Sequence, residues 1–185
     1  MNFQGSAGLI CEFMEYALCS ILYQRGIYSE ADFSERSRFG LQLPTAAHPA
    51  LALYLENLFN QLYTWISNGE ISTLFLTIVN NANEPVEKYA FGFVVQGPRE
   101  ASQAQSYEAI AKALFKLSQF LVQQPVLPGG LSFIIQVEEH TTKSIPSQWA
   151  IGNERAVPAN ATVTELPLAE ALDTGISTKV YTWRH

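Results

Sequence analysis

Positive charge is scarce in this sequence. Eleven Lys and Arg residues stand against 17 Asp and Glu residues, which gives a formal net charge of −6 at pH 7. Proteins that grip nucleic acid neutralise its phosphates with clustered basic side chains, so this balance argues against direct binding of DNA or RNA. If the protein works near DNA, a partner is expected to make the contact.

Cysteine and histidine are equally scarce. Cys11 and Cys19 lie in one helical pattern, about 12 Å apart along its axis, which is too far for a disulfide. Both are expected to be buried thiols. No two of the histidines, His48, His140 and His185, have the spacing of metal ligands. The sequence therefore predicts no zinc site, no other metal site and no cofactor.

Sequence signatures of catalysis are missing as well. Pro128-Gly129-Gly130 is better explained as a turn into a strand than as a phosphate loop, and no nucleophile elbow or kinase signature is present. Glu138 and Glu139 adjoin at a strand end and should point to opposite faces. His48 precedes a proline at a helix start, where a cap or core contact is expected. The chain is not expected to be an enzyme; the alternative is an unrecognised cleft holding groups with shifted pKa values.

Export and membrane signals are not visible either. The first residues lack a basic region, a long apolar run and a small-residue cleavage site. No uninterrupted apolar stretch approaches the roughly 18 residues that cross a bilayer. We therefore expect a soluble intracellular protein that does not contact membranes.

Apolar residues, in contrast, are plentiful. They make up 48% of the 185 residues, against 15% charged residues, a balance that excludes a disordered chain. This length fits a single domain, residues 1–185, with a sizeable core.

Three segments show the periodicity of amphipathic helices. The first ends at Gly26, the second begins at His48-Pro49 and ends at Asn68-Gly69, and the third lies between Pro98 and Pro125. Their apolar stripes are Leu9, Phe13, Ala17 and Ile21; Leu51, Leu55, Leu58, Leu62 and Ile66; and Ile110, Leu114, Leu117 and Leu121. Each helix needs a sheet against which to bury its stripe.

Segments rich in β-branched and aromatic residues predict that sheet. Residues 71–79 and 86–95 flank the turn sequence NNANEP and should form a hairpin. Alternation along the second strand turns Glu87 and the aromatic residues Tyr89, Phe91 and Phe93 toward the helices, and Lys88 to the opposite face. Residues 131–137 are apolar on both faces, which predicts a central strand. Helices covering one face of a sheet give an α+β fold.

The C-terminal segment, residues 141–185, differs from the rest. It has no helical stripe and ends in GISTKVYTW, whose alternation predicts a strand. Long stretches with little regular structure after a finished core tend to be functional or mobile. This segment is the first indication of function.

Several stretches together resemble the HORMA family over nearly the whole chain. Residues 12–28, EFMEYALCSILYQRGIY, resemble its first helix, HPALALYLENLF its second helix, NEPVEKYAFGF a hairpin strand, and the region from Trp149 to Tyr181 its mobile safety belt. The resemblance implies three helices on a mainly antiparallel sheet, with a core of about residues 6–140 and a belt of about residues 141–185. It also implies a non-catalytic adaptor whose belt closes over a partner peptide added as a strand to the sheet.

Two branches of the family are similar to this sequence. LICEFME, His48-Pro49 followed by Tyr54, the stretch from Pro85 to Tyr89 with Phe91, and Leu166-Pro167-Leu168 resemble the accessory subunit of translesion DNA polymerase zeta. SILYQRGIY is similar to the spindle-checkpoint branch, which binds a peptide of a cell-cycle regulator. We favour the polymerase branch, whose partner is a proline-containing peptide of the catalytic subunit, and we expect a nuclear protein of DNA-damage bypass.

The resemblance also implies contact residues. Tyr54 and Trp149 match positions that touch the captured peptide; the alternative is that Tyr54 completes the helix stripe and Trp149 fills the core. Tyr181, with Lys179 and Leu166 near Glu165, corresponds to a surface for the C-terminal domain of the scaffold polymerase, although Lys179 and Glu165 depart from the residue types found there. Lys112 matches a position where HORMA domains pair as homodimers; the alternative is a solvated lysine. Remodelling by an AAA+ ATPase follows by analogy.

Overall fold

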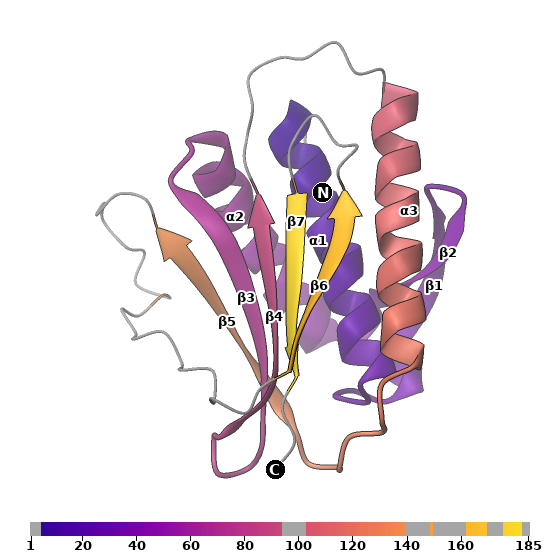
Figure 1. Cartoon of the computed structure of the whole chain (residues 1–185), viewed down its shortest axis with the longest axis vertical. Helices are drawn as coiled ribbons and strands as arrows, with labels where there is room; N and C mark the ends of the chain where they lie inside the picture. Colours follow the sequence, from indigo (N-terminus) through magenta and orange to yellow (C-terminus); the bar gives the residue numbers. More distant parts are fainter. Residues whose placement is uncertain (1–4, 94–102, 140–148, 150–161, 170–175, 183–185) are drawn as a thin grey trace.

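Figure 1 shows a computed structural model of the chain, which describes residues 5–93, 103–139, 149, 162–169 and 176–182. Within these residues, three α-helices lie behind a five-stranded sheet, and a two-stranded hairpin lies beside them. The elements are α1 (Gly5–Gln24), the 3-10 helix η1 (Glu30–Asp32), β1 (Phe33–Arg38), β2 (Leu41–Ala46), α2 (Pro49–Ser67), β3 (Ile71–Val79), β4 (Pro85–Phe93), α3 (Gln103–Val122), β5 (Ser132–Glu139), β6 (Thr162–Ala169) and β7 (Ile176–Thr182). The expected α+β fold is confirmed.

Helix α1 is the central helix of the core. Its window Ser6–Gln24 is long and apolar enough to cross a membrane by length and composition, with a mean hydropathy of 1.2, but 72% of that window is buried inside the fold. Contacts with α2, α3 and the hairpin account for an apolar surface on nearly every side. The helix ends as predicted at Gly26, whose φ of 67° lets its N–H and that of Ile27 bond back to Tyr23 and Leu22.

Helices α2 and α3 bury the stripes that the sequence predicts. All the stripe residues named for these two helices are buried in one hydrophobic cluster with α1. Helix α2 begins at Pro49, where the missing N–H of proline costs no hydrogen bond. The expectation for His48 was wrong in its detail: the residue holds the N-cap position, but its side chain is exposed and makes no capping hydrogen bond.

The large sheet has the strand order β5-β3-β4-β7-β6, with every neighbouring pair antiparallel. The predicted hairpin is β3–β4, in which Leu76 pairs with Tyr89 and Leu74 with Phe91. Both aromatic residues are fully buried against the helices, while the Phe93 side chain lies outside the described residues. The predicted C-terminal strand is β7, and it pairs with β4; its neighbour β6 was not predicted.

Strand β5 is the clearest correction to the sequence analysis. Residues 131–137 were expected to form a central strand, yet in the described sheet β5 lies at the end of the strand order and pairs with β3 alone. None of its residues is fully buried, and its interior residues are half-buried on both faces. Its apolar composition therefore reflects an apolar edge rather than a position between two strands.

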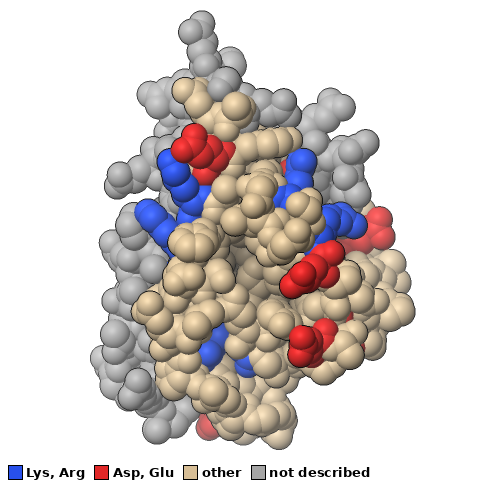
Figure 2. Space-filling model, turned by 90° about the vertical axis from the view of Figure 1, so that its right-hand side faces the viewer, with Lys and Arg blue, Asp and Glu red and all other residues tan. Residues whose placement is uncertain are grey.

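The hairpin β1–β2 was not predicted, because its sequence is polar and charged. It packs against α1 and is attached there by Arg38, which donates to both carboxylate oxygens of Glu12 and to the hydroxyl of Tyr107 on α3. The guanidinium also stacks over the rings of Phe39 and Tyr107. Figure 2 shows this side of the molecule, where acidic and basic side chains are interspersed.

A buried ion pair joins α1 to the sheet. Arg25, just past the end of α1, donates from Nε and Nη2 to the two carboxylate oxygens of Glu87 on β4, at 2.9 and 2.7 Å. The hydroxyl of Tyr89 donates to the same carboxylate, and Arg25 also donates to the carbonyl of Pro125 in the loop before β5. Lys88 lies on the opposite face, as predicted, with its ammonium 4.2 Å from the ring centroid of Phe75.

We expect Arg25→Ala to destabilise the fold by about 3–5 kcal/mol, because it leaves the Glu87 carboxylate buried without its charge partner. Urea unfolding followed by circular dichroism measures the change. The control is Lys112→Ala, which removes an exposed pair with Glu108 and should cost no more than about 0.5 kcal/mol. Equal urea midpoints for the two variants would contradict a dominant role for the buried pair.

Candidate functional site

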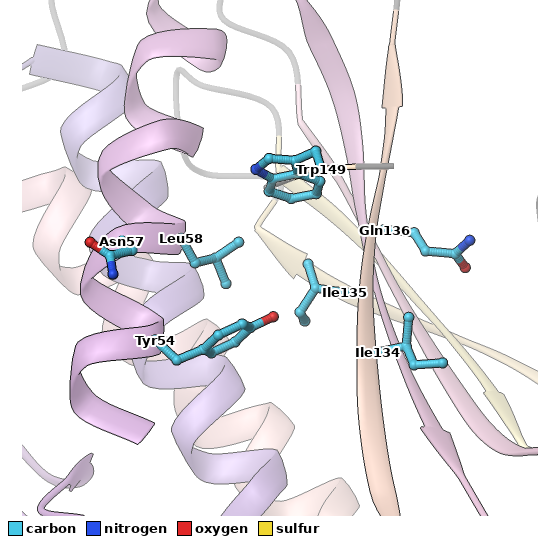
Figure 3. Close-up of a pocket in the computed structure, with 7 residues that line it drawn as sticks. All are labelled: Tyr54, Asn57, Leu58, Ile134, Ile135, Gln136 and Trp149. Atoms are coloured by element: carbon cyan, nitrogen blue, oxygen red, sulfur yellow. The ribbon is translucent and has the colours of Figure 1, made fainter. Parts of the chain in front are cut away.

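A cavity of about 610 Å³ opens between helix α2 and the edge strand β5. Figure 3 shows it between the helix and the strand, with Tyr54, Asn57 and Leu58 coming from α2. Its remaining described lining residues are Ile134, Ile135, Gln136 and Trp149. The cavity is therefore bounded by a helix face, a strand edge and one tryptophan from the C-terminal segment.

Side chains along β5 alternate across this edge. Phe133, Ile135 and Val137 pack toward the hydrophobic core, and in Figure 3 Ile135 points toward α2 while Ile134 and Gln136 point away from it. An edge strand presents a row of backbone N–H and C=O groups to any chain laid beside it. The apolar side chains here are arranged on the two faces of such an edge.

Tyr54 forms the wall of the cavity on the helix side. Its side chain is 43% exposed, and its ring lies edge-on to Phe133, with the ring centroids 5.7 Å apart. Partial burial, with a smaller contribution from Tyr28, raises the pKa of the Tyr54 hydroxyl above its usual value. The group therefore stays neutral at physiological pH and offers an aromatic face with one polar tip.

Trp149 forms the upper wall as drawn in Figure 3. Its ring packs edge-on against Trp65 of α2, with the centroids 4.9 Å apart, and it extends the hydrophobic core. Trp149 and Tyr54 are 95 residues apart in the sequence, yet they line the same cavity. The two residues implied by the family resemblance are thus brought together.

A series of aromatic contacts leads from Tyr54 through Phe133 to Tyr28, next to the cavity. Tyr28 lies edge-on to Phe133 at a centroid distance of 6.3 Å, and the exposed ring of His48 lies 6.5 Å from Tyr28. These contacts join the loop after α1 and the start of α2 to the start of β5.

The described lining of the cavity is mostly apolar and carries no charged side chain. Tyr54 is its single titratable residue, and no carboxylate, imidazole or thiol is among the described lining residues. In the part of the chain that the structure describes, no group of three or more His, Cys, Asp or Glu side chains could hold a metal ion. Among the described strands β5 has a neighbour on one side alone, and a largely apolar slot beside such an edge has the geometry that strand addition of a peptide uses.

The other predicted contact residues lie elsewhere. Lys179 and Tyr181 are on β7, where they pair with Ala90 and Lys88 of β4, and Leu166 is on β6 opposite Thr178. Their backbones are thus placed at the end of the sheet opposite β5, while their side chains, and that of Glu165, lie outside the described residues. Lys112 is exposed on α3 and forms an ion pair of 2.6 Å with Glu108.

Comparison with known proteins identifies the family. The HORMA domain matches residues 6–150 of the chain. The chain belongs to the HORMA domain family. HORMA relatives include the mouse mitotic spindle assembly checkpoint protein MAD2A, 28% identical over 157 residues, covering 80% of this chain and 77% of that protein. The zebrafish mitotic spindle assembly checkpoint protein MAD2B is 26% identical over 172 residues, covering 85% and 81%.

Solved structures agree on the HORMA fold. A chain in the crystal structure of the mitotic checkpoint complex matches with a TM-score of 0.87 at 23% identity, covering 98% of this chain and 100% of that chain. The Caenorhabditis elegans HTP-1 structure, bound to the HIM-3 closure motif, matches with a TM-score of 0.70 at 14% identity, covering 96% and 89%. At these identities the likeness establishes the fold alone.

Several lining residues were not anticipated from the sequence. Asn57 and Leu58 belong to the helix predicted around them, and Leu58 was assigned to the core stripe; Ile134, Ile135 and Gln136 were assigned to a central strand. The LSFIIQV stretch could have located Ile134, Ile135 and Gln136, because a strand that is apolar on both faces also fits a sheet edge that binds a further strand.

The two cysteines offer a test of whether the fold carries a reactive nucleophile. Burial, with the nearby Glu15 carboxylate as a smaller cause, raises the pKa of the Cys11 and Cys19 thiols to about 12. At pH 8 only about one thiol in 10,000 is ionised, and the thiolate is the reactive form. We expect Ellman's reagent to modify neither thiol in the native protein and both after guanidinium denaturation. Rapid native labelling would contradict this arrangement.

Proposed function

We propose that this HORMA domain is a non-catalytic adaptor that captures an extended peptide of a partner protein along β5. The observation that carries the proposal is the edge of β5 that no described strand covers, beside the cavity lined by Tyr54 and Trp149. Backbone hydrogen bonds to the edge supply affinity that does not depend on ligand sequence, and side-chain pockets supply selectivity. The C-terminal segment contributes Trp149 as the closing wall.

The geometry defines what the peptide needs. Because strand side chains alternate, every second ligand residue would face α2 and enter the slot between Tyr54, Leu58 and Trp149. That residue should be apolar, since the described lining carries no charge. The residues between would lie on the opposite face, next to Ile134 and Gln136. A proline in the ligand lowers the cost of ordering an extended chain.

The relatives favour a partner of the spindle-checkpoint kind. Proteins named MAD2A or MAD2 in mouse, human, budding yeast and fission yeast are 26–28% identical to this chain. The matching structures include the mitotic checkpoint complex and the Caenorhabditis elegans proteins HTP-1 and HTP-2 bound to the HIM-3 closure motif. We therefore propose a checkpoint-type peptide of a cell-cycle regulator as the ligand.

A second candidate is the accessory role in polymerase zeta that the sequence analysis favoured. Its support is that Tyr54 and Trp149, the positions which that resemblance implies for peptide contact, line one cavity. The same cavity serves either ligand. In this alternative the β6–β7 hairpin, with Lys179 and Tyr181, would meet the scaffold polymerase.

Two neighbouring residues of α2 give a matched test of the groove. Tyr54 lines the cavity, whereas Leu53, which is 59% exposed, does not. Truncating a central aromatic anchor of a binding site costs about 2 kcal/mol or more, or about 30-fold in affinity. We expect Tyr54→Ala and Trp149→Ala each to weaken capture of a checkpoint-type peptide by that order, measured by fluorescence anisotropy. Leu53→Ala should bind as the wild type does.

The circular dichroism spectra of these variants should be unchanged, because Tyr54 and Trp149 lie at the margin of the core. Wild-type affinity in Tyr54→Ala and Trp149→Ala would remove the groove from the proposed function.

Competition between two peptides separates the candidates. One is a checkpoint-type segment of a cell-cycle regulator, and the other is a proline-containing segment of the polymerase zeta catalytic subunit. We expect the unlabelled checkpoint-type peptide to displace a labelled polymerase-type peptide at a lower concentration than the reverse. The opposite order would assign the chain to the polymerase branch, and failure of both to bind would overturn the adaptor proposal.

A further inference from the structure

The hairpin β1–β2 is attached to the core differently from the other elements. Among the described strands it forms a sheet of its own, beside the helices (Figure 1). Helices α1 and α2 each bury a long apolar stripe, whereas Leu43 is the one buried residue of the two hairpin strands. The residues that are partly buried against the core are Phe33, Phe39, Leu41 and Ala46. An element with so little apolar burial is expected to open at a lower free energy than the core.

Charged and aromatic contacts gather at the tip of the hairpin. Arg38 donates from Nε and Nη2 to the two carboxylate oxygens of Glu12, at 2.6 and 2.9 Å. The ring of Phe39 lies edge-on to Tyr16 of α1 and to Tyr107 of α3, with centroid distances of 6.1 and 5.1 Å. The tip is thus docked on α1 and α3 together.

The backbone of the tip is strained. Phe39 has a φ of 53°, beside Gly40 with a φ of 73°. Glycine adopts this conformation readily, but a bulky side chain there is unfavourable. The ring contacts of Phe39 offset the strain while the tip is docked, and unfolding of the hairpin releases it. The strain therefore favours the open state.

Electrostatic attraction contributes to the docking. Arg36 pairs with Leu43 in the hairpin register, so it shares the face of that buried residue, and it lies within electrostatic range of Glu15 on α1. The ion pair of Arg38 and Glu12 is partly exposed, by 35% and 25% of the two side chains. Salt screens such charges more than it screens buried ones. Added salt should therefore loosen the hairpin before it affects the core.

The base of the hairpin is fixed by its own hydrogen bonds. The carbonyl of Asp32, just before β1, accepts the N–H groups of Ala47 and His48 at 2.8 and 3.0 Å. The carboxylate of Asp32 in turn accepts the N–H and the hydroxyl of Ser29. These bonds do not involve the two strands, so the base can act as a hinge while the tip moves.

Ring contacts connect the hairpin to the wall of the peptide cavity. Phe33, the first residue of β1, lies edge-on to Tyr28 at a centroid distance of 6.4 Å. Tyr28 contacts Phe133 of β5, and Phe133 contacts Tyr54, which lines the cavity. A movement of Phe33 therefore removes a neighbour of the rings that support Tyr54.

We propose that the hairpin β1–β2 is a strap that opens as a unit while the core stays folded, and that its closure stabilises the Tyr54 wall of the peptide cavity. The second part rests on the proposed function. Because the closed strap and the bound peptide stabilise the same ring contacts, each favours the other by the same factor.

Hydrogen exchange of the full chain without peptide, resolved by residue with NMR, tests the opening. We expect protection factors in β1 and β2 at least about tenfold lower than in the interior of α1. Arg38→Ala should lower them about tenfold further, because it removes two charge-assisted hydrogen bonds, and leave α1 unchanged. Arg38→Lys keeps the charge but loses the planar fork, so it should lie between. Lys112→Ala, which removes an exposed ion pair on α3, should have no effect on the hairpin.

Salt gives an independent measurement of the same opening. Raising sodium chloride from about 0.05 to about 0.5 M should lower hairpin protection in the wild type and lower it less in Arg38→Ala. Equal protection of the hairpin and α1 in the wild type, or an equal loss in both in Arg38→Ala, would show that the hairpin unfolds only with the core. Either result would overturn the strap.

A saturating checkpoint-type peptide, with binding verified by fluorescence anisotropy, tests the link to the groove. We expect it to raise hairpin protection about fivefold. The N–H groups of Gln123 and Gln124 bond within the end of α3, report local fraying there and should not change. Phe33→Leu removes the ring that contacts Tyr28 and should bind the peptide as the wild type does, without the gain in hairpin protection.

The outcomes separate the strap from the proposed function. A bound peptide that leaves hairpin protection unchanged would overturn the link and leave the proposed function in place. If no peptide binds, the proposed function and the link both fail, and the peptide-free measurements still decide whether the hairpin is a strap.

Discussion

The interaction on which the rest of the structure depends is the ion pair of Arg25 and Glu87. It is buried at the end of the central helix, and its carboxylate receives a third hydrogen bond from Tyr89. The same guanidinium reaches the carbonyl of Pro125, so one side chain fixes α1, strand β4 and the loop that leads to β5. A buried charge tolerates little displacement of its partner, because an unpaired charge in the interior is costly. The contact thus ties the loop before the edge strand to the end of the central helix.

The two ends of the large sheet differ in how they are covered by other strands. The β6–β7 hairpin covers the edge of β4, whereas β5 has no second neighbour among the described strands. Natural proteins commonly protect open edges with charges, prolines or short strands. Here the open edge instead carries apolar side chains beside a cavity with aromatic walls. An edge of this kind is suited to the addition of a further strand.

Much of the fold was accessible from the sequence, and the failures have physical causes. Helices were found because apolar stripes recur at helical spacing, and β3–β4 because a polar turn separates two β-rich runs. The hairpin β1–β2 was missed because its charged residues, such as Arg38, are held by tertiary contacts with Glu12 and Tyr107 that local patterns do not encode. β5 was misplaced because a run of residues that is apolar on both faces fits an apolar edge strand as well as a central one. Tyr54 and Trp149 were predicted from the family resemblance alone, because no local sequence pattern connects residues so far apart. The ion pair of Arg25 and Glu87 was not predicted for the same reason.

The route of the chain has a kinetic consequence. β5 ends at Glu139 and β6 begins at Thr162, yet the two strands occupy opposite ends of the strand order. At about 4.8 Å between neighbouring strands, the intervening residues join points separated by nearly the full width of the sheet, and Trp149 among them packs on α2. If the groove captures a peptide as proposed, the segment that carries Trp149 is anchored at its far end by the seven register pairs of β7 with β4. Freeing that end would require the local unfolding of these pairs, which would slow release of the peptide beyond what its own contacts set.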